Sequence, residues 1–455
     1  MATTVGVGLL RDRLSNLPDG ILVTILSRLS IDKAARCSIL ASRWRHLFPS
    51  TLLDLRAFTM SRSQNIAKLV TTILAAHPTE PIRTFMVGEL FLRPEDKSVV
   101  DGWLRDLSTR GIQDLSLSFN CFDEIPESLF ACSSLKRLHL IHGTFPDATP
   151  AAASLACLTE INLFSVRISG DSLNTLLLQC TALEHLTVKC NLHSLLLRSR
   201  SLKVLNCTGA DFKELFIDDA PNLERILHRY MQQRKVQIKV VHAPKLEFFG
   251  YIGMSNKMEI GDTSFVEVLI DVKTIMPSMK TLAIDLSCDQ QGYIQEGYID
   301  WLMQLLKLFP RLETLYIESS HWSGAQDAVS GSWEMHRLSV HCNLEKVVFQ
   351  AYRGHKWQRE MAKFLHGRSE VLKTMEFHCM NDGTREGFGK APSEEWVREQ
   401  KELLCLDSTA ARDASFLFFK GQMVVNHFEF CNKEQYQRNY YCNLYFDESV
   451  LHGQR

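Results

Sequence analysis

The sequence lacks two features that would direct the protein to a membrane or to nucleic acid. No apolar run approaches the roughly 18 uninterrupted residues of a membrane-spanning helix, because the stretch 301–309 is short and contains Gln304 and Lys307. The formal net charge is only -1 and the pI about 7.0, so the whole-chain charge attracts neither nucleic acid nor anionic lipid. These absences predict protein partners, with no membrane and no nucleic acid.

A secretory signal is also absent from the amino terminus. The apolar stretch 5–10 is too short for one and runs directly into the charged triplet 11–13. The thirteen cysteines are an odd number, and many of them, such as Cys207 and Cys405, lie inside apolar patterns. Reduced, buried thiols are the expected state, and we predict an intracellular protein of the nucleus and/or cytoplasm.

Metal-binding and phosphate-binding motifs are missing as well. The pair His139 and His142 has no second pair of Cys or His at the spacing that zinc requires. The glycine groups 6–8 and 383–389 do not stand between a strand and a helix, as phosphate-binding loops must. We therefore expect no metal and no cofactor.

A catalytic cysteine would need a neighbouring cation or base to lower its thiol pKa. The nearest candidates are Cys190 with His193 and Cys342 with His341. Buried packing is the ordinary role for such cysteines, and we predict no catalytic residue.

The first sixty residues show the pattern of a small helical module. Residues 17–29, LPDGILVTILSRL, carry apolar side chains at 21, 22, 25, 26 and 29, which form one helical face. A second helix is predicted after Ser30, which can cap it, with packing groups that include Ile39. A third is predicted over Arg43–Leu47, before Pro49.

Three such short helices bury little surface alone, so the module is expected to bind a second protein or to cap the segment that follows it. Residues 11–56 hold eight Lys or Arg and four Asp, a local net charge of +4, which would steer an acidic partner to it.

Residues 17–47 resemble the F-box, in particular the plant form that opens Leu-Pro-Asp, continues Ile-Leu-Ser-Arg-Leu and closes Arg-Trp-Arg-His-Leu. The resemblance implies docking on a Skp-type adaptor and, through it, on a cullin. By position it implies that the adaptor contacts come from Leu17, Pro18, Ile21, Leu22, Ile25, Leu26, Leu29 and Trp44. The sequence departs from the family pattern at Gly20, which weakens a helix by about 1 kcal/mol, and at Cys37 and Ala41.

A Leu-x-x-Leu-x-Leu frame then recurs along the chain. Its middle positions 115, 138 and 161 lie 23 residues apart, within the roughly 20–29 residue period of leucine-rich repeats. Each copy predicts a short strand with alternate side chains in the core and outside. Two further copies of the frame begin at residues 183 and 192, and less regular copies begin at residues 202, 212, 223, 246, 279, 312, 344 and 372.

Spacing distinguishes two kinds of repeat. The amphipathic stretches 172–180 and 301–309 predict helices on the convex side. The copies from 183 to 223 come about ten residues apart, too close for a strand and a helix each, and predict strand-turn pieces. The basic run Arg225–Lys239 is expected to be a solvated edge.

The carboxy-terminal part predicts strand, helix (356–366), strand, polar loop (381–394), helix (395–404) and strand (FLFF). This order resembles the FBD region that follows the repeats in many plant F-box proteins. The fold class is therefore α/β, a small three-helix F-box before an irregular leucine-rich-repeat horseshoe with an FBD-like end. The predicted divisions are 13–56 F-box, 57–110 linker and cap, 111–340 repeats, 341–420 FBD-like region and 421–455 atypical tail.

The resemblance implies a non-catalytic receptor subunit of a Skp-cullin-F-box ubiquitin ligase. Its F-box would hold the adaptor, and its repeats would bind an unknown target protein for ubiquitination and degradation. Two alternatives stay open: a repeat scaffold whose F-box no longer recruits a cullin, and a ligase or hydrolase with its own thiol nucleophile.

Overall fold

The computed structural model describes most of the chain between residues 17 and 420. The predicted tail and most of the polar loop 381–394 lie outside the described residues. The described residues are 17–27, 29, 31–40, 42–47, 53–55, 66–75, 81–89, 97–119, 124–146, 155–190, 192–207, 213–228, 236–254, 256–261, 263–266, 269–270, 275–286, 298–318, 343–379, 392–404 and 414–420.

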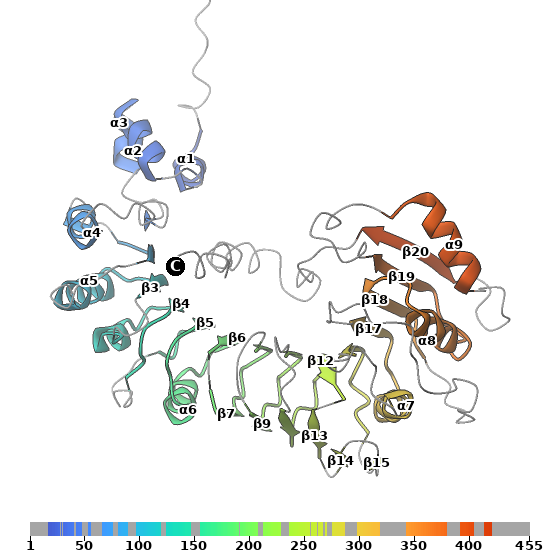
Figure 1. Cartoon of the computed structure of the whole chain (residues 1–455). Helices are drawn as coiled ribbons and strands as arrows, with labels where there is room; N and C mark the ends of the chain where they lie inside the picture. Colours follow the sequence, from blue (N-terminus) through green and yellow to red (C-terminus); the bar gives the residue numbers. More distant parts are fainter. Residues whose placement is uncertain are drawn as a thin grey trace, which may run out of the picture. The chain divides into compact units, whose positions relative to one another are not determined.

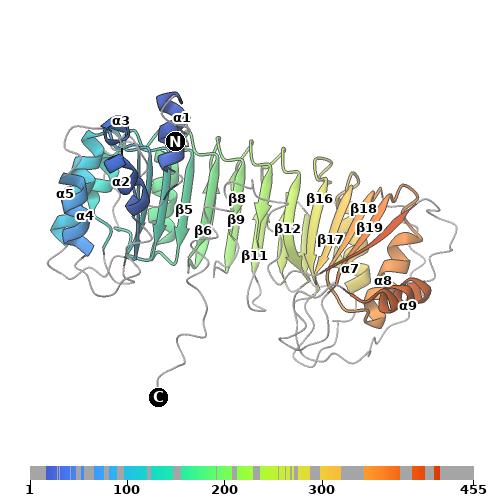
Figure 2. The ribbon, with the colours of Figure 1, turned by 90° about the horizontal axis from the view of Figure 1, so that it is seen from above.

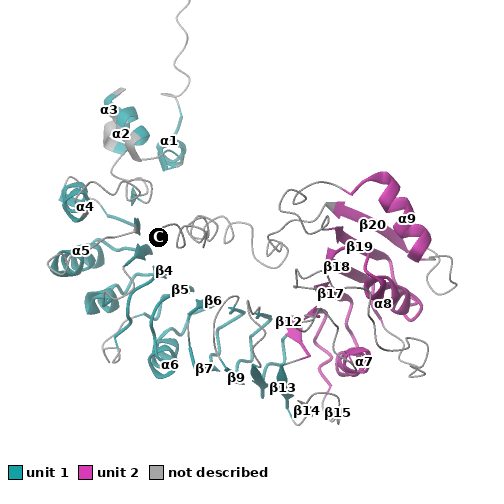
Figure 3. Ribbon diagram, viewed as in Figure 1, with its two compact units in different colours: residues 1–246, 256–262 teal, residues 247–255, 263–455 magenta. Residues whose placement is uncertain are grey.

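The chain divides into two compact units, which Figure 3 shows in different colours. Unit 1 comprises residues 1–246 and 256–262, and unit 2 comprises residues 247–255 and 263–455. Both mix helices with parallel strands, so the predicted α/β class is confirmed.

The helices of unit 1 precede its strands or alternate with them (Figure 1). They are α1 Asp19–Ser27, α2 Ile31–Leu40, α3 Ser42–Leu47, α4 Ile66–Ala75, α5 Lys97–Thr109, the 3-10 helix η3 Glu127–Ala131 and α6 Gly170–Gln179. Helix α6 begins where Ser169 Oγ accepts a hydrogen bond from the Ser172 N–H at 3.0 Å, an N-cap that satisfies one free backbone donor.

The strands of unit 1 form two parallel sheets. The first has the order β1, β2, β3, β4, β5, β6, β8, β10: Leu53–Asp54, Thr84–Glu89, Asp114–Ser118, Arg137–Ile141, Glu160–Phe164, His185–Lys189, Val204–Asn206 and Arg225–Leu227. The second has the order β13, β11, β9, β7: Lys257–Ile260, Gln237–Val240, Glu214–Asp219 and Ser194–Arg198. From β6 to β11 successive strands alternate between the two sheets, so no helix is needed there; Figure 2 shows the strands side by side.

The repeat frames predicted the strands with a constant offset. Each strand begins two residues after the first apolar residue of its frame, so β4 starts at Arg137 although its frame starts at Leu135. Leu135 is 0% exposed, and its N–H donates to the Cys132 carbonyl at 3.1 Å, which places it in the turn before the strand. The first leucine is therefore a core residue of the turn.

Consecutive turns are joined by one carbonyl that accepts two hydrogen bonds. The Gln113 carbonyl accepts from the N–H groups of Lys136 (2.8 Å) and Arg137 (2.9 Å), and the same pattern repeats at Lys136, Thr159, Glu184 and Lys203. This repeated bonding keeps the backbone polar groups of the turns satisfied.

A prediction about the repeats of unit 1 was wrong. Part of the basic run Arg225–Lys239, expected to be a solvated edge, is strand: Arg225–Leu227 forms β10 and Gln237–Val240 forms β11. Ile238 and Val240 are 0% and 2% exposed, because alternation places them in the core while Lys239 faces outward.

Unit 2 also combines parallel strands with helices. Its strand order is β12, β16, β17, β18, β19, β20: Phe248–Gly253, Thr281–Asp285, Thr314–Glu318, Lys346–Tyr352, Thr374–Cys379 and Ser415–Lys420. A short antiparallel pair, β14 Thr263–Val266 and β15 Leu269–Ile270, belongs to the same unit. The helices are α7 Tyr298–Leu308, α8 Lys356–His366 and α9 Glu394–Leu404.

The last helices and strands of unit 2 are fixed by buried polar contacts. Gln358 Oε1 accepts hydrogen bonds from the N–H groups of Arg353 (2.9 Å) and His355 (3.2 Å). The Tyr352 hydroxyl donates to Gln400 Oε1 at 3.1 Å, which ties α9 to β18. Within the described residues, no helix is long and apolar enough to cross a membrane.

Candidate functional site

Helices α1, α2 and α3 pack against one another around a small core. Leu22, Leu26 and Ala34 are 0%, 1% and 2% exposed. Two large apolar side chains stay outside this core: Ile21 is 47% exposed and Ile39 is 74% exposed. The expectation that Ile39 is a packing group was therefore wrong, because α2 turns this side chain toward solvent.

An arginine links the two ends of the module. Arg43 Nε and Nη2 both donate to Asp19 Oδ1, at 2.9 and 2.5 Å, and Nη2 also donates to the Leu17 carbonyl at 2.7 Å. The start of α1 is thus held by α3. In the sequence both residues count only as charges, and their separation of 24 residues gives no local signal of the contact.

The eight residues predicted to bind an adaptor fall into three groups by exposure. Pro18 and Ile21 are exposed, and Leu22 and Leu26 are buried in the module. The partly exposed members are Leu17, Ile25, Leu29 and Trp44.

Gly20 does not interrupt α1, which begins at Asp19 and continues through it. A Cβ at Gly20 would meet no heavy atom within 4 Å. We expect Gly20→Ala to stabilise α1 by about 0.5–1 kcal/mol, because alanine loses less backbone entropy on folding. Amide hydrogen exchange of residues 19–27 in the full chain should become slower.

The matched control is Gly354→Ala in unit 2, for which the opposite sign is expected. Gly354 has a φ of +73°, and a Cβ there would lie 2.6 Å from Gln400 Oε1. Faster exchange in α1 of the Gly20→Ala chain would contradict the open helical environment seen here.

The face of β3 to β6 that points away from the buried leucines forms a second candidate surface. The strand registers align its side chains in three rows across the strands. The first row is Asp114, Arg137, Glu160 and His185; the middle row is Ser116, His139, Asn162 and Thr187; the last row is Ser118, Ile141, Phe164 and Lys189.

The first and last rows differ in chemistry. In the first row Asp114 forms an ion pair with Arg137, and Glu160 Oε1 accepts a hydrogen bond from Asn162 Nδ2 at 2.8 Å. In the last row Phe164 lies beside Lys189, and burial lowers the pKa of the Lys189 ammonium. The His139 ring stacks on Phe164 with centroids 5.1 Å apart.

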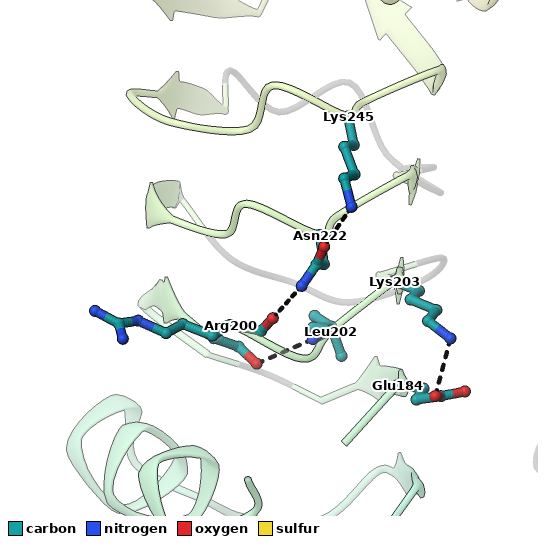
Figure 4. Close-up of polar contacts among 7 residues, drawn as sticks. Glu184, Arg200, Leu202, Lys203, Asn222 and Lys245 are labelled. Carbon is teal, nitrogen blue, oxygen red and sulfur yellow. Dashed lines mark hydrogen bonds and ion pairs between the residues drawn. The ribbon is translucent and has the colours of Figure 1, made fainter. Parts of the chain in front are cut away.

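Hydrogen bonds and ion pairs between polar residues lie at the turns that lead into the strands, and Figure 4 shows three of them in unit 1. Lys203 Nζ donates to Glu184 Oε1 at 2.9 Å, and this contact raises the pKa of the Lys203 ammonium. Asn222, in the turn before β10, links two neighbouring turns. Its Nδ2 donates to the Arg200 carbonyl at 2.6 Å, and its Oδ1 accepts from Lys245 Nζ at 2.7 Å. Their partners within the chain give these side chains a structural role.

Among the described residues, burial raises the thiol pKa of each buried cysteine. Cys190 is 2% exposed, and burial raises its pKa to about 12, the opposite of what a nucleophile requires. Cys207 is 0% exposed, as predicted, whereas Cys342 with His341 and Cys405 lie outside the described residues. Among the described residues no group of three or more His, Cys, Asp or Glu is placed to hold a metal ion.

These pKa values predict which thiols react in the native protein. At pH 8, iodoacetamide should modify the exposed Cys157 and leave Cys190 and Cys180 unmodified, because burial raises both of their pKa values to about 12. Peptide mass spectrometry before and after denaturation measures this directly. Modification of Cys190 at the rate of Cys157 in the folded chain would contradict the buried environment.

Comparisons with known proteins find two family matches, one over helices α1 to α3 and one over the repeats. Residues 14–55 match the F-box domain family, and residues 100–317 match the family of the LRR repeats of the FBD-associated F-box protein At5g56370. The chain is 28% identical over 399 residues to the F-box/FBD/LRR-repeat protein At1g13570 of Arabidopsis thaliana, covering 80% of this chain and 90% of that protein.

Two further Arabidopsis thaliana relatives show the same pattern. The F-box/FBD/LRR-repeat protein At5g56420 is 26% identical over 405 residues, which cover 80% of this chain and 90% of that protein. The F-box/LRR-repeat protein At3g03360 is 30% identical over 205 residues, which cover 43% of this chain and 40% of that protein.

Proposed function

Because the chain resembles the plant F-box/FBD/LRR-repeat proteins over 80% of its length, we propose that it is a non-catalytic substrate receptor of a Skp-cullin-F-box ubiquitin ligase. In this role α1 to α3 hold a Skp-type adaptor, and the repeats hold a target protein. The target is brought close to a conjugating enzyme on the cullin, so the reaction is accelerated by proximity. Ubiquitination and degradation of the target follow.

The observation that carries this proposal is the coincidence of the F-box match with a helical module that leaves large apolar side chains in solvent. The matched residues 14–55 include all of α1, α2 and α3. Ile21 at 47% and Ile39 at 74% exposure are the apolar groups that a docked protein would cover. Basic side chains at Lys33 and Arg36 are also exposed and favour an acidic partner.

Burial refines the roles of the eight predicted adaptor contacts. We propose that Pro18 and Ile21 contact the adaptor directly, with the partly exposed members of the set around them. Leu22 and Leu26 then act by holding α1 in place, since both are buried inside the chain. The Arg43–Asp19 contact would keep Pro18 and Ile21 at the start of a fixed helix.

The test is capture of a purified Skp-type adaptor by full-length variants. Ile21→Asp places a charge in the proposed contact and should weaken adaptor binding at least ten-fold without unfolding α1, because Ile21 is half exposed. Val241→Asp is the control, since Val241 is 48% exposed in a turn of unit 1 outside the F-box. Failure of the unmodified chain to bind the adaptor would favour the scaffold alternative, and equal loss in both variants would exclude a specific contact at Ile21.

A further inference from the structure

Strand β20 is the last strand of unit 2 and has an open edge. Within the described residues it pairs with β19 alone, in a parallel register that runs unbroken over the whole strand. The Ser415 N–H donates to the Lys373 carbonyl at 2.9 Å, so alternation along the strand directs the backbone N–H and C=O groups of Phe416 and Phe418 away from β19. These are the groups that an added strand would bond.

The open edge of β20 has none of the features that usually prevent strand addition. Natural edge strands are commonly protected by charged side chains, by proline or by a bulge. Residues 415–419, SFLFF, contain neither a charge nor a proline, and their register with β19 has no bulge. The edge is therefore suited to accept an extended segment.

Apolar side chains beside this edge are in contact with solvent on both faces of the sheet. On the outer face Leu417 and Phe419 are 41% and 42% exposed. On the inner face Phe418 is partly exposed, whereas Phe377, which stacks on it from β19 at 4.7 Å, is fully buried. An added strand would cover Phe418 as β20 covers Phe377.

The charge next to the edge is negative. Figure 1 shows α9 beside β20, and the Trp396 ring of α9 lies 6.3 Å from the Phe418 ring. Glu399 follows Trp396 by three residues, so it lies on the same side of the helix, and it is exposed. Helix α9 holds four glutamates and two basic residues, a net charge of -2. Lysine or arginine side chains on an added strand would meet this charge favourably.

The same charge opposes a second copy of this chain as the added strand. Two β20 strands that pair antiparallel about a two-fold axis would place both α9 helices on one face of the joined sheet. Their equal net charges would repel each other. A separate protein with a basic segment suits both the apolar and the charged surroundings of the edge.

We propose that the open edge of β20 binds an extended, basic segment of a separate protein as an added strand. The segment pairs with the backbone of Phe416 and Phe418, and its apolar side chains pack beside Leu417 and Phe419. Its lysine or arginine side chains cover Phe418 with their aliphatic stems and direct their charges to α9. This surface of unit 2 goes beyond the proposed receptor function, since it requires neither the adaptor nor a cullin.

The experiment selects short linear peptides from a displayed random library on the full-length chain and measures the enriched peptides by fluorescence anisotropy. We expect the enriched sequences to alternate apolar and basic residues. The double variant Leu417→Ala, Phe419→Ala should weaken their binding at least ten-fold, and Glu399→Gln should weaken it less. Ile275→Ala is the matched control that should leave binding unchanged, because Ile275 is 58% exposed before β16, with three strands between β16 and β20.

Hydrogen exchange at single-residue resolution locates the site in the full-length chain. The backbone amides of Phe416 and Phe418 should exchange rapidly in the free chain and several-fold more slowly with bound peptide, while those of β17 stay unchanged. Protection of these two amides without peptide would overturn the proposal. If it did not depend on protein concentration, this chain would cover its own edge, and if it rose with concentration, a second copy would.

The binding data can overturn the proposal independently. It fails if no peptide is enriched, if the enriched peptides lack basic residues, or if the double variant binds them as tightly as the unmodified chain. Glu399→Gln leaves the apolar packing of β20 in place, so an unchanged affinity in this variant would remove the role of the charge of α9 and with it the choice of a basic partner.

Discussion

Phe377→Ala should lower the free energy of unfolding of unit 2 by about 3–5 kcal/mol, the usual cost of truncating a fully buried phenylalanine. Phe377 is 0% exposed and lies between Phe349 and Phe418, with ring centroids 5.4 and 4.7 Å away and rings nearly parallel at 10° and 16°. Tyr352 packs against the same ring at 4.7 Å. Alanine would leave a void among three aromatic rings that strand pairing holds in place.

Chemical denaturation of the full chain, followed by hydrogen exchange of β18 to β20, measures this effect. Phe419→Ala is the control on the neighbouring strand: Phe419 is 42% exposed, so its loss should cost less than about 1 kcal/mol. A cost for Phe377→Ala no larger than that of Phe419→Ala would mean that the ring stack does not stabilise the sheet.

The sequence predicted the strands well because the alternation of core and outer residues is a local property. The helix predicted over 356–366 matches α8 Lys356–His366, and the one over 395–404 matches α9 to within one residue. The first apolar residue of each frame was assigned to a strand although it lies in the turn before it. A buried leucine gives the same apolar signal in a turn as in a strand. Leu135 at 0% and Leu158 at 0% exposure are such residues.

The sequence pattern did not predict which strands belong to which of the two sheets. The frames that begin at 192 and 202 have the same spacing, yet the first yields β7 in one sheet and the second yields β8 in the other. Both strands bury alternate residues, Leu195 and Leu205 at 0%, so alternation gives no sheet assignment. The sheet to which a strand belongs is decided by the strands with which it forms backbone hydrogen bonds, and a single sequence does not show those partners.

The candidate sites show the same limit. The F-box motif located α1 to α3, but periodicity placed Ile39 among packing groups, whereas it is 74% exposed. A ten-residue helix between two others can present an apolar residue on either side, and only the packing angle decides which one is buried. For the same reason the Arg43–Asp19 contact, 24 residues apart in sequence, appeared only in the structure.

Leu22→Asp should abolish adaptor binding by a different route from Ile21→Asp. Leu22 is 0% exposed, so the new carboxylate would be buried without a partner at a cost of several kcal/mol. A module of three short helices has little stability in reserve, so α1 should lose its packing on the rest of the module. Hydrogen exchange of residues 19–27 and 31–40 in the full chain should approach that of an unfolded segment.

Comparison of the two neighbouring substitutions therefore distinguishes a side chain that contacts the adaptor from one that holds α1 in place. Ile21→Asp should lose the adaptor while exchange in α1 and α2 stays native, and Leu22→Asp should lose both. If Leu22→Asp kept native exchange and still lost the adaptor, Leu22 would have to leave the core and meet the adaptor directly, as the motif alone implies. That outcome would make the bound F-box different from the free one, because a side chain that is fully buried in the chain reaches a partner only after α1 shifts.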